Sequence, residues 1–311
     1  MILGSKNLIA RFWFLIFFLL LLLFAGIFHI SMKQIVQSVV ALRTWQLCFL
    51  IAIYFLISLC IILSRKYLIF CLNHSCTFKN LVFIHFASSA AHYSSPGKIG
   101  YPITVYLLKK YEDIPYSSGS ALILIELAVN MGISGLSAIL GSFFYFREYV
   151  GSIFEVLFIL SAVGIITLWG IRFHFSKKKK SNRFENGIRN TIKAFSSIPL
   201  SMLLFYCVLS ACTQIIIAAS LVALCFFLSV NISICQAITA SAAAFFLGAV
   251  SMIPMGLGIR EASMILFLSQ FGIDNVNSIL IVTIQRLLST GLSLVLGSIF
   301  GIYLGIKNLK D

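Results

Sequence analysis

The residues of this sequence that could do chemistry are charged side chains inside otherwise apolar segments. They are Lys98, Glu126, Arg260, Glu261 and Arg286. An uncompensated charge at the middle of a membrane costs about 3 kcal/mol on insertion scales, so these side chains must form ion pairs or line a polar cavity. Lysine and arginine both bind phosphate, and arginine can do so through two parallel hydrogen bonds. The pattern predicts binding of a phosphate-bearing head group, and ion pairs that only stabilise a helix bundle are the simpler alternative.

Two stretches rich in helix-breaking residues carry or precede these charges. The candidate breaks are Pro96, Gly97 and Gly100 in PGKIG, and Pro254, Gly256 and Gly258 in PMGLG. A long apolar segment with an ionisable residue follows each break, and in the first of these segments Asn130 would share the helix face of Glu126. Broken helices in membranes place free N–H groups and helix ends in a shared polar interior, where an anion can bind. The similarity of the two stretches predicts an inverted repeat.

The elements that must hold these residues are transmembrane helices. The chain has 311 residues, of which 60% are hydrophobic and 10% charged, and its mean hydropathy is +1.04, which excludes a soluble fold. We predict an all-α polytopic membrane protein with about six full spans and two re-entrant broken-helix pairs. The predicted spans are 12–30, 44–63, 119–146, 150–171, 200–229 and 278–306, and the pairs are 81–108 and 237–272.

The predicted organisation is a single integral membrane domain over 1–311, with no soluble domain. Its halves are 1–171 and 200–311, and the polar loop 172–199 between them carries eight basic residues. Basic loops face the cytoplasm, so the loop, the N-terminus and the C-terminus are expected on the cytoplasmic side of a bacterial-type plasma membrane. Arg65 and Lys66 fall in a predicted cytoplasmic loop at 64–80.

Other candidate sites have simpler interpretations. His85 and His92 would share a helix face, but a metal needs more ligands, so we expect two core histidines with satisfied hydrogen bonds and no metal or cofactor. Gly297, Gly301 and Gly305 form a doubled G-x-x-x-G that predicts a close-packing helix face. The net charge of +14 fits loops that face anionic lipid, and no nucleic-acid partner is expected.

Two segments resemble the signatures of a known family. PGKIGYPITVYLLKKYEDIPYSSGSALILIELAVN and LGAVSMIPMGLGIREASMILFLSQFGI, the latter followed by QRLLSTGLSLVLG, are similar to the lysylphosphatidylglycerol synthase transmembrane-region family, also called flippase-like proteins. The resemblance covers nearly the whole chain. It implies re-entrant helices and, for some members, translocation of a lipid between leaflets. The matching positions are Pro96, Lys98, Gly100, Glu126, Pro254, Gly258, Arg260, Glu261 and Arg286.

The sequence departs from the family pattern in its first half. Tyr101 stands where an acidic residue is common, Leu127 where arginine often follows the glutamate, and Asn130 where aspartate is common. The first half has therefore lost charge relative to the family pattern, and we expect the second half to be the more sensitive to mutation. Glu261 is expected to hold Arg260 in place.

The leading hypothesis is a flippase for an anionic or polyprenyl-phosphate-linked lipid. The substrate-binding residues would be Lys98, Glu126, Asn130, Arg260, Glu261 and Arg286, and the partners would be membrane lipids. One alternative is a scaffold for a separate lipid or glycan synthase, and another is an intramembrane head-group transferase. The transferase is disfavoured because such chemistry usually needs paired carboxylates for a metal or a nucleophilic pair, so no enzymatic activity is expected.

Overall fold

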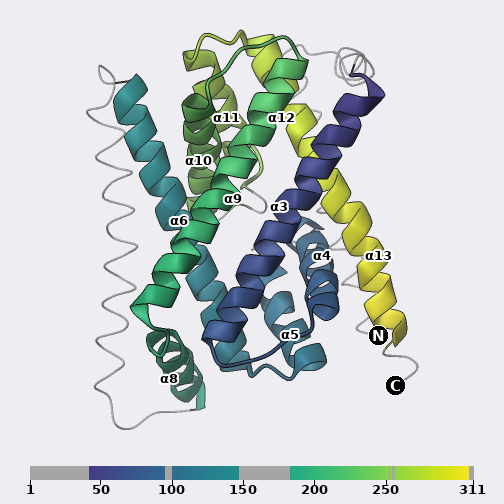
Figure 1. Ribbon diagram of the computed structural model, residues 1–311, viewed down its shortest axis with the longest axis vertical. Helices are drawn as coiled ribbons and strands as arrows, with labels where there is room; N and C mark the ends of the chain where they lie inside the picture. Colours follow the sequence, from purple (N-terminus) through teal and green to yellow (C-terminus); the bar gives the residue numbers. More distant parts are fainter. Residues whose placement is uncertain (1–41, 95–99, 147–182, 252, 254–255, 308–311) are drawn as a thin grey trace.

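The computed structural model describes residues 42–94, 100–146, 183–251, 253 and 256–307, and the regular elements within these ranges are all helices (Figure 1). The predicted spans 12–30 and 150–171 lie outside the described residues. So do Pro96, Gly97, Lys98 and Pro254, which are four of the residues that the sequence singles out.

Four continuous helical segments in the described part are long and apolar enough to cross a membrane. They are α3 (Thr44–Cys71), α6 (Tyr116–Tyr145), α9 (Leu200–Phe227), and α12 (Asn275–Arg286), which continues through the π-helix η3 (Leu287–Gly291) into α13 (Leu292–Lys307). Their outer faces carry exposed large apolar side chains, as a lipid-facing surface requires. The all-α membrane fold is therefore confirmed.

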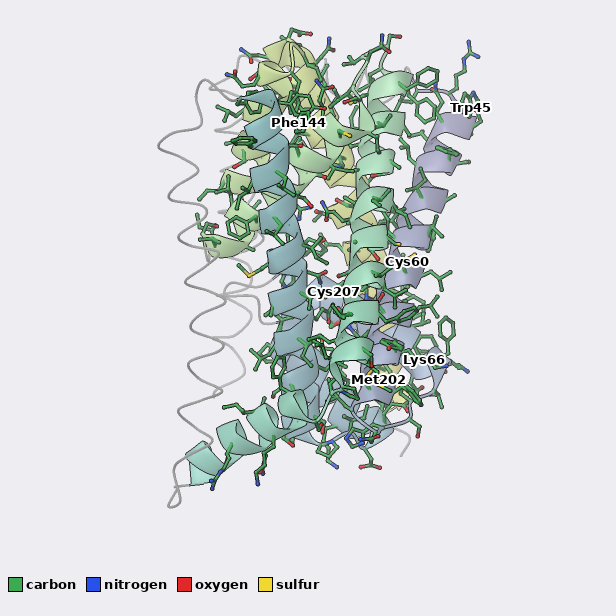
Figure 2. All side chains as sticks on the ribbon, turned by 60° about the vertical axis from the view of Figure 1, so that its left-hand side comes forward. Trp45, Cys60, Lys66, Phe144, Met202 and Cys207 are labelled. Carbon is green, nitrogen blue, oxygen red and sulfur yellow. The ribbon has the colours of Figure 1, made fainter. Side chains whose placement is uncertain are left out.

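Helix α3 runs from the upper to the lower end of the bundle, and α6 and α9 run in the opposite direction (Figure 2). In Figure 2, Trp45 at the start of α3 and Phe144 at the end of α6 lie near the upper end of the bundle. Lys66 near the end of α3 and Met202 near the start of α9 lie toward the lower end. These relative directions agree with the order of sides that the sequence predicts for the ends of the three helices.

Two pairs of shorter helices lie in opposite halves of the bundle (Figure 1). The pair in the lower half consists of α4 (Phe78–Ser94) and α5 (Gly100–Glu112), and the pair in the upper half of α10 (Ile234–Val250) and α11 (Ile259–Gln270). With 13 and 12 residues, α5 and α11 are about 20 and 18 Å long, too short for a hydrocarbon core of about 30 Å.

One helix of each short pair packs against a long helix from the other half of the sequence. Helix α4 packs along α13 and α10 packs along α6, while α3 crosses α9. Each reciprocal interface has a glycine at its closest approach, because a Cβ on Gly141 would lie 1.8 Å from Oγ1 of Thr239, and one on Gly297 would lie 2.3 Å from Cβ of Ala90. The predicted packing role is confirmed for Gly297 and wrong for Gly301, where an added Cβ would meet open space.

Each short pair is built into its own hydrophobic core. The upper core includes Ala240 and Ala244 of α10 together with Leu268 of α11, and all three are almost completely buried. The lower core includes Leu81 of α4 and Leu108 of α5, both fully buried. The two halves thus have separate apolar cores, and the polar residues described below lie beside these cores.

The ends of the helices explain two differences from the sequence-based expectation. Helix α3 continues to Cys71, just before Asn73, whose φ of 58° is left-handed, so Arg65 and Lys66 lie in the helix and not in a loop. The predicted polar loop contains helix α8 (Arg183–Ser196), which packs against α6. Its apolar residues recur at helical spacing, and this amphipathic pattern stabilises a helix in a segment that overall composition marks as polar.

Candidate functional site

The upper half contains a charged cluster where α11 begins and α12 ends. Arg260 and Glu261 lie in the first turn of α11, and Arg286 is the last residue of α12. Oε1 of Glu261 forms an ion pair with Nε of Arg286. The other carboxylate oxygen accepts a hydrogen bond of 2.8 Å from the backbone N–H of Gly258. Glu261 is therefore the ion-pair partner of Arg286, and it interacts with Arg260 electrostatically without an ion pair among the described residues.

Glycines shape the backbone that leads into this cluster. Gly256 and Gly258 have φ values of +65° and +80°, in the left-handed region that glycine adopts without steric cost. Gly256 also lies against the backbone of Gly248 in α10, where a Cβ would come within 2.8 Å of the Gly248 Cα. A side chain at Gly256 would therefore collide with α10, whereas at Gly258 it is the positive φ that favours glycine. The turn places the free N–H groups at the start of α11 beside the carboxylate of Glu261.

Arg260 differs from Arg286 in its surroundings. Its guanidinium lies over the ring of Phe245, 5.8 Å from the ring centroid, and among the described residues it forms no ion pair. It interacts electrostatically with Arg286, with Tyr93 near the end of α4, and with Glu261. Among the described residues of this cluster there are two arginines and one glutamate, so their formal charges sum to one positive charge.

The lower half contains a second ion pair, which the sequence did not predict. Nε of Arg65 donates to Oε2 of Glu126 at 3.1 Å, and Nη2 donates to Oε1 at 2.8 Å, so the guanidinium binds the carboxylate through two bonds. Both side chains are largely buried. Arg65 was missed because it follows an apolar run at a point where a cytoplasmic loop was expected. The apolar residues YLIFCL at 67–72 were the available signal that the helix continues.

Further polar side chains surround this pair. Ser210 of α9 donates a hydrogen bond to Oδ1 of Asn130, so the partner of Asn130 lies on a neighbouring helix. Tyr101 and Tyr206 both interact electrostatically with Arg65 and Glu126. His85 also interacts electrostatically with Arg65. Arg65 thus brings to the lower half a positive charge that lies outside the two segments quoted for the resemblance.

Gly100 and His85 complete the comparison with the sequence-based expectation. Gly100 starts α5 and permits close contact with α4, because a Cβ there would lie 2.5 Å from Cβ of His92. His85 is buried, and its Nδ1 has no hydrogen-bond partner within the described part of the chain, so the expectation of a satisfied core histidine is wrong for this residue. Among the described residues, no group of three or more His, Cys, Asp or Glu side chains could hold a metal ion.

Both clusters contain an Arg–Glu ion pair, Arg65 with Glu126 in the lower half and Arg286 with Glu261 in the upper half. Among the described residues, the lower cluster has no additional cation, and Arg260 adds a further positive charge to the upper cluster. Such a cluster can bind an anion without first breaking an ion pair, since guanidinium groups bind phosphate and carboxylate oxygens through charge-assisted hydrogen bonds.

Comparison with known protein families gave a match over most of the chain. A family model described as the lysylphosphatidylglycerol synthase TM region matches residues 8–297, which include every described residue of both clusters. Comparison with curated proteins gave no match.

Proposed function

The chain belongs to the lysylphosphatidylglycerol synthase transmembrane-region family, and from this premise we propose that it moves an anionic or polyprenyl-phosphate-linked lipid between the leaflets of a membrane. The observation that carries the proposal is Arg260, a cation at the inner end of a short helix with no ion-pair partner among the described residues. A site that keeps one unneutralised charge beside an ion pair is suited to an anion that binds and leaves. A purely structural cluster would more often be neutral, because unpaired charge in a membrane is costly.

The arrangement of the short helices supports alternating access. In our proposal, α4 with α5 and α10 with α11 are re-entrant pairs of an inverted repeat, entering from opposite sides. The reciprocal packing of α4 on α13 and α10 on α6 is what a two-fold axis in the membrane plane would produce. Movement of one half against the other would open the polar interior first to one side and then to the other.

The head group would be held by residues of both halves. In the upper half, Arg260 and Arg286 would contact the phosphate, and Glu261 would keep Arg286 oriented through their ion pair. The N-terminal turn of α11 adds free backbone N–H groups and the positive end of a helix dipole. The proposed substrate path also includes Lys98, Glu126 and Asn130. The role of Lys98 is proposed from the sequence alone.

Orientation and organisation follow the same proposal. The lower end, with Lys66 and helix α8, would face the cytoplasm of a bacterial-type plasma membrane, as would both termini. The protein would be a single membrane domain that binds lipids and performs no covalent chemistry of its own. A lipid or glycan synthase remains the proposed protein partner if a complex forms.

A transport assay with purified protein tests the function. Wild-type protein in proteoliposomes should speed the transbilayer movement of fluorescent phosphate-bearing lipids. The lipids tested should include a phospholipid with one negative charge and a polyprenyl phosphate. Arg260→Gln should slow this movement about tenfold or more, since a charge-assisted hydrogen bond is worth about 1.5–3 kcal/mol. Arg260→Lys should keep part of the activity, because lysine retains the charge without the bidentate geometry.

The matched control is Lys79→Gln, which removes one positive charge from an exposed position at the start of α4. It should transport at the wild-type rate. If wild-type protein moves no phosphate-bearing lipid faster than protein-free vesicles do, the translocase proposal is wrong. If this protein, inactive in transport, nevertheless captures a lipid or glycan synthase, the result would favour the scaffold hypothesis.

A further inference from the structure

The continuous helical segment made of α12, η3 and α13 belongs to both halves of the bundle (Figure 1). Its first part, α12, buries Ile284 in the upper core. Its last part, α13, is held by the lower short pair. Phe300 stacks on Phe86 of α4 with the ring centroids 5.4 Å apart. Tyr111 of α5 donates a hydrogen bond of 3.0 Å to the carbonyl of Leu304. A movement of one half against the other must therefore bend or twist this segment between α12 and α13.

The π-helix η3 (Leu287–Gly291) lies at this boundary. In a π-helix each hydrogen bond spans five residues instead of four, and single π turns within α-helices are frequent at functional sites. The π turn contains one residue more than the α-helical turn that would replace it. Conversion of η3 to α-helix would therefore rotate α13 against α12 by up to about 100°. Because each of these helices is fixed to its own half, the conformation of η3 is coupled to the relative orientation of the halves.

Thr290 lacks a hydrogen bond that an α-helical turn would provide. Its hydroxyl oxygen is buried in η3 and makes no hydrogen bond to any described residue. Three threonines within α-helices behave differently. Oγ1 of Thr104, Thr213 and Thr239 donates to the carbonyl four residues earlier, at 2.9, 2.9 and 2.8 Å. In an α-helical turn the Thr290 hydroxyl would reach the carbonyl of Arg286 in the same way.

The charged cluster of the upper half adjoins this turn. Arg286 immediately precedes η3, and it forms an ion pair with Glu261 of α11. The ion pair fixes the end of α12 to the start of α11, so it opposes rotation at the residue next to the π turn. A phosphate group bound to Arg286 would compete with Glu261 for the guanidinium. Ligand binding at the upper cluster would thus weaken a constraint on η3.

We propose that η3 is the hinge between the two halves, with a π turn in one state of the protein and an α-helical turn in the other. The ion pair of Arg286 with Glu261 favours the π turn, and the hydroxyl of Thr290 favours the α-helical turn. This inference rests on the proposed function in assuming that the halves move against each other. The rotation of α13 then carries a change at the upper cluster to α4 and α5, because η3 is a two-state element that contacts with both halves influence.

Fluorine NMR of the purified full-length protein in detergent tests the hinge. Trifluoromethylphenylalanine incorporated at Leu287, an exposed position in η3, should report the two turns as two signals. Arg286→Gln should raise the ratio of the α-helical to the π signal about tenfold, because it removes the ion pair. In that background Thr290→Val should lower the same ratio about tenfold, since valine keeps the shape of threonine and removes the hydroxyl that only the α-helical turn satisfies.

Thr213→Val is the matched control, because it removes a hydroxyl that is already bonded within the uninterrupted helix α9. It should leave the ratio of the signals unchanged. A single signal in both the wild type and Arg286→Gln would overturn the hinge. So would a ratio that Thr290→Val leaves unchanged or that Thr213→Val lowers equally.

Thermal unfolding gives a second readout that does not depend on Arg286→Gln. In otherwise wild-type protein, Thr290→Val should raise the midpoint, because it removes a buried hydroxyl that lacks a partner. Thr213→Val should not raise it, and a Thr290→Val midpoint at or below the wild-type value would contradict the hinge. Neither measurement uses lipid. Two signals that respond as expected therefore support the hinge even where the transport assay fails, and a single signal overturns it even where lipid is moved.

Discussion

The guanidinium of Arg65 donates to both carboxylate oxygens of Glu126, through Nε at 3.1 Å and Nη2 at 2.8 Å, across 61 residues of sequence. This relationship joins two long helices inside the lower half of the bundle. It also gives a structural role to Glu126, which the sequence predicts as a substrate contact. With both oxygens bound to Arg65, Glu126 first compensates a buried charge.

Glu126→Gln should destabilise the protein strongly because it leaves the Arg65 guanidinium buried without its counter-charge. Removing one partner of a buried ion pair typically costs about 3–5 kcal/mol. The double variant Arg65→Gln/Glu126→Gln should recover part of that loss, since two neutral amides can hydrogen-bond to each other. Thermal unfolding in detergent measures both. A single variant as stable as wild type would show that the pair contributes no net stability.

Gly297→Leu should separate α13 from α4, because a Cβ at Gly297 already falls 2.3 Å from Ala90 Cβ and 2.4 Å from the carbonyl oxygen of Phe86. Overpacking of this kind costs about 1–3 kcal/mol or more. Gly301→Leu, one turn further along the same helix, introduces the same side chain into open space and serves as the control. The thermal midpoint should fall for the first variant alone, and equal midpoints for the two would contradict the packing described for α4 and α13.

Gly258→Ala tests the conformation of the upper break. The residue has φ +80° with open space around a Cβ, so alanine would add backbone strain and no clash. The left-handed conformation costs a non-glycine residue about 1–2 kcal/mol. Gly132→Ala is a fitting comparison, because Gly132 lies within α6 with open space around it and should gain about 0.5–1 kcal/mol of stability. In thermal unfolding, the midpoint should fall for Gly258→Ala and rise for Gly132→Ala. A higher midpoint for Gly258→Ala would contradict the positive φ described for this residue.

Asp274 makes a pH-dependent contribution to the stability of the folded protein. Its side chain caps α12, and the hydrogen bond from the backbone N–H of Asn277 lowers the pKa of this exposed carboxyl. Because the folded pKa lies below the unfolded one, the stabilisation is present above the unfolded pKa and is lost as pH falls through the folded value. Asp274→Ala should therefore be less stable than wild type by about 1 kcal/mol at pH 7. The two thermal midpoints should converge as the pH falls through the range where Asp274 becomes protonated, and a constant difference would contradict the ionised cap.

Sequence patterns determine much of this protein because they depend on local properties. Apolar runs are long enough to span a bilayer whatever surrounds them, and the glycines of PMGLG can turn the chain where other residues cannot. These patterns were enough to predict the long helices α3, α6, α9 and α12 with α13, and two short pairs between them. The end of α3 was misplaced because charge at Arg65 and Lys66 indicates a loop unless a buried partner compensates it.

The tertiary structure alone decided which charges meet. Glu261 is next to Arg260 in the chain, yet it pairs with Arg286, because consecutive residues of a helix point in different directions while the end of α12 approaches the start of α11. Arg65 gains its partner in the same way, from the packing of α3 near α6. Ion pairs between helices depend on the rotation and depth at which the helices pack. Those quantities are set by side-chain fit along the whole interface, to which no single motif corresponds.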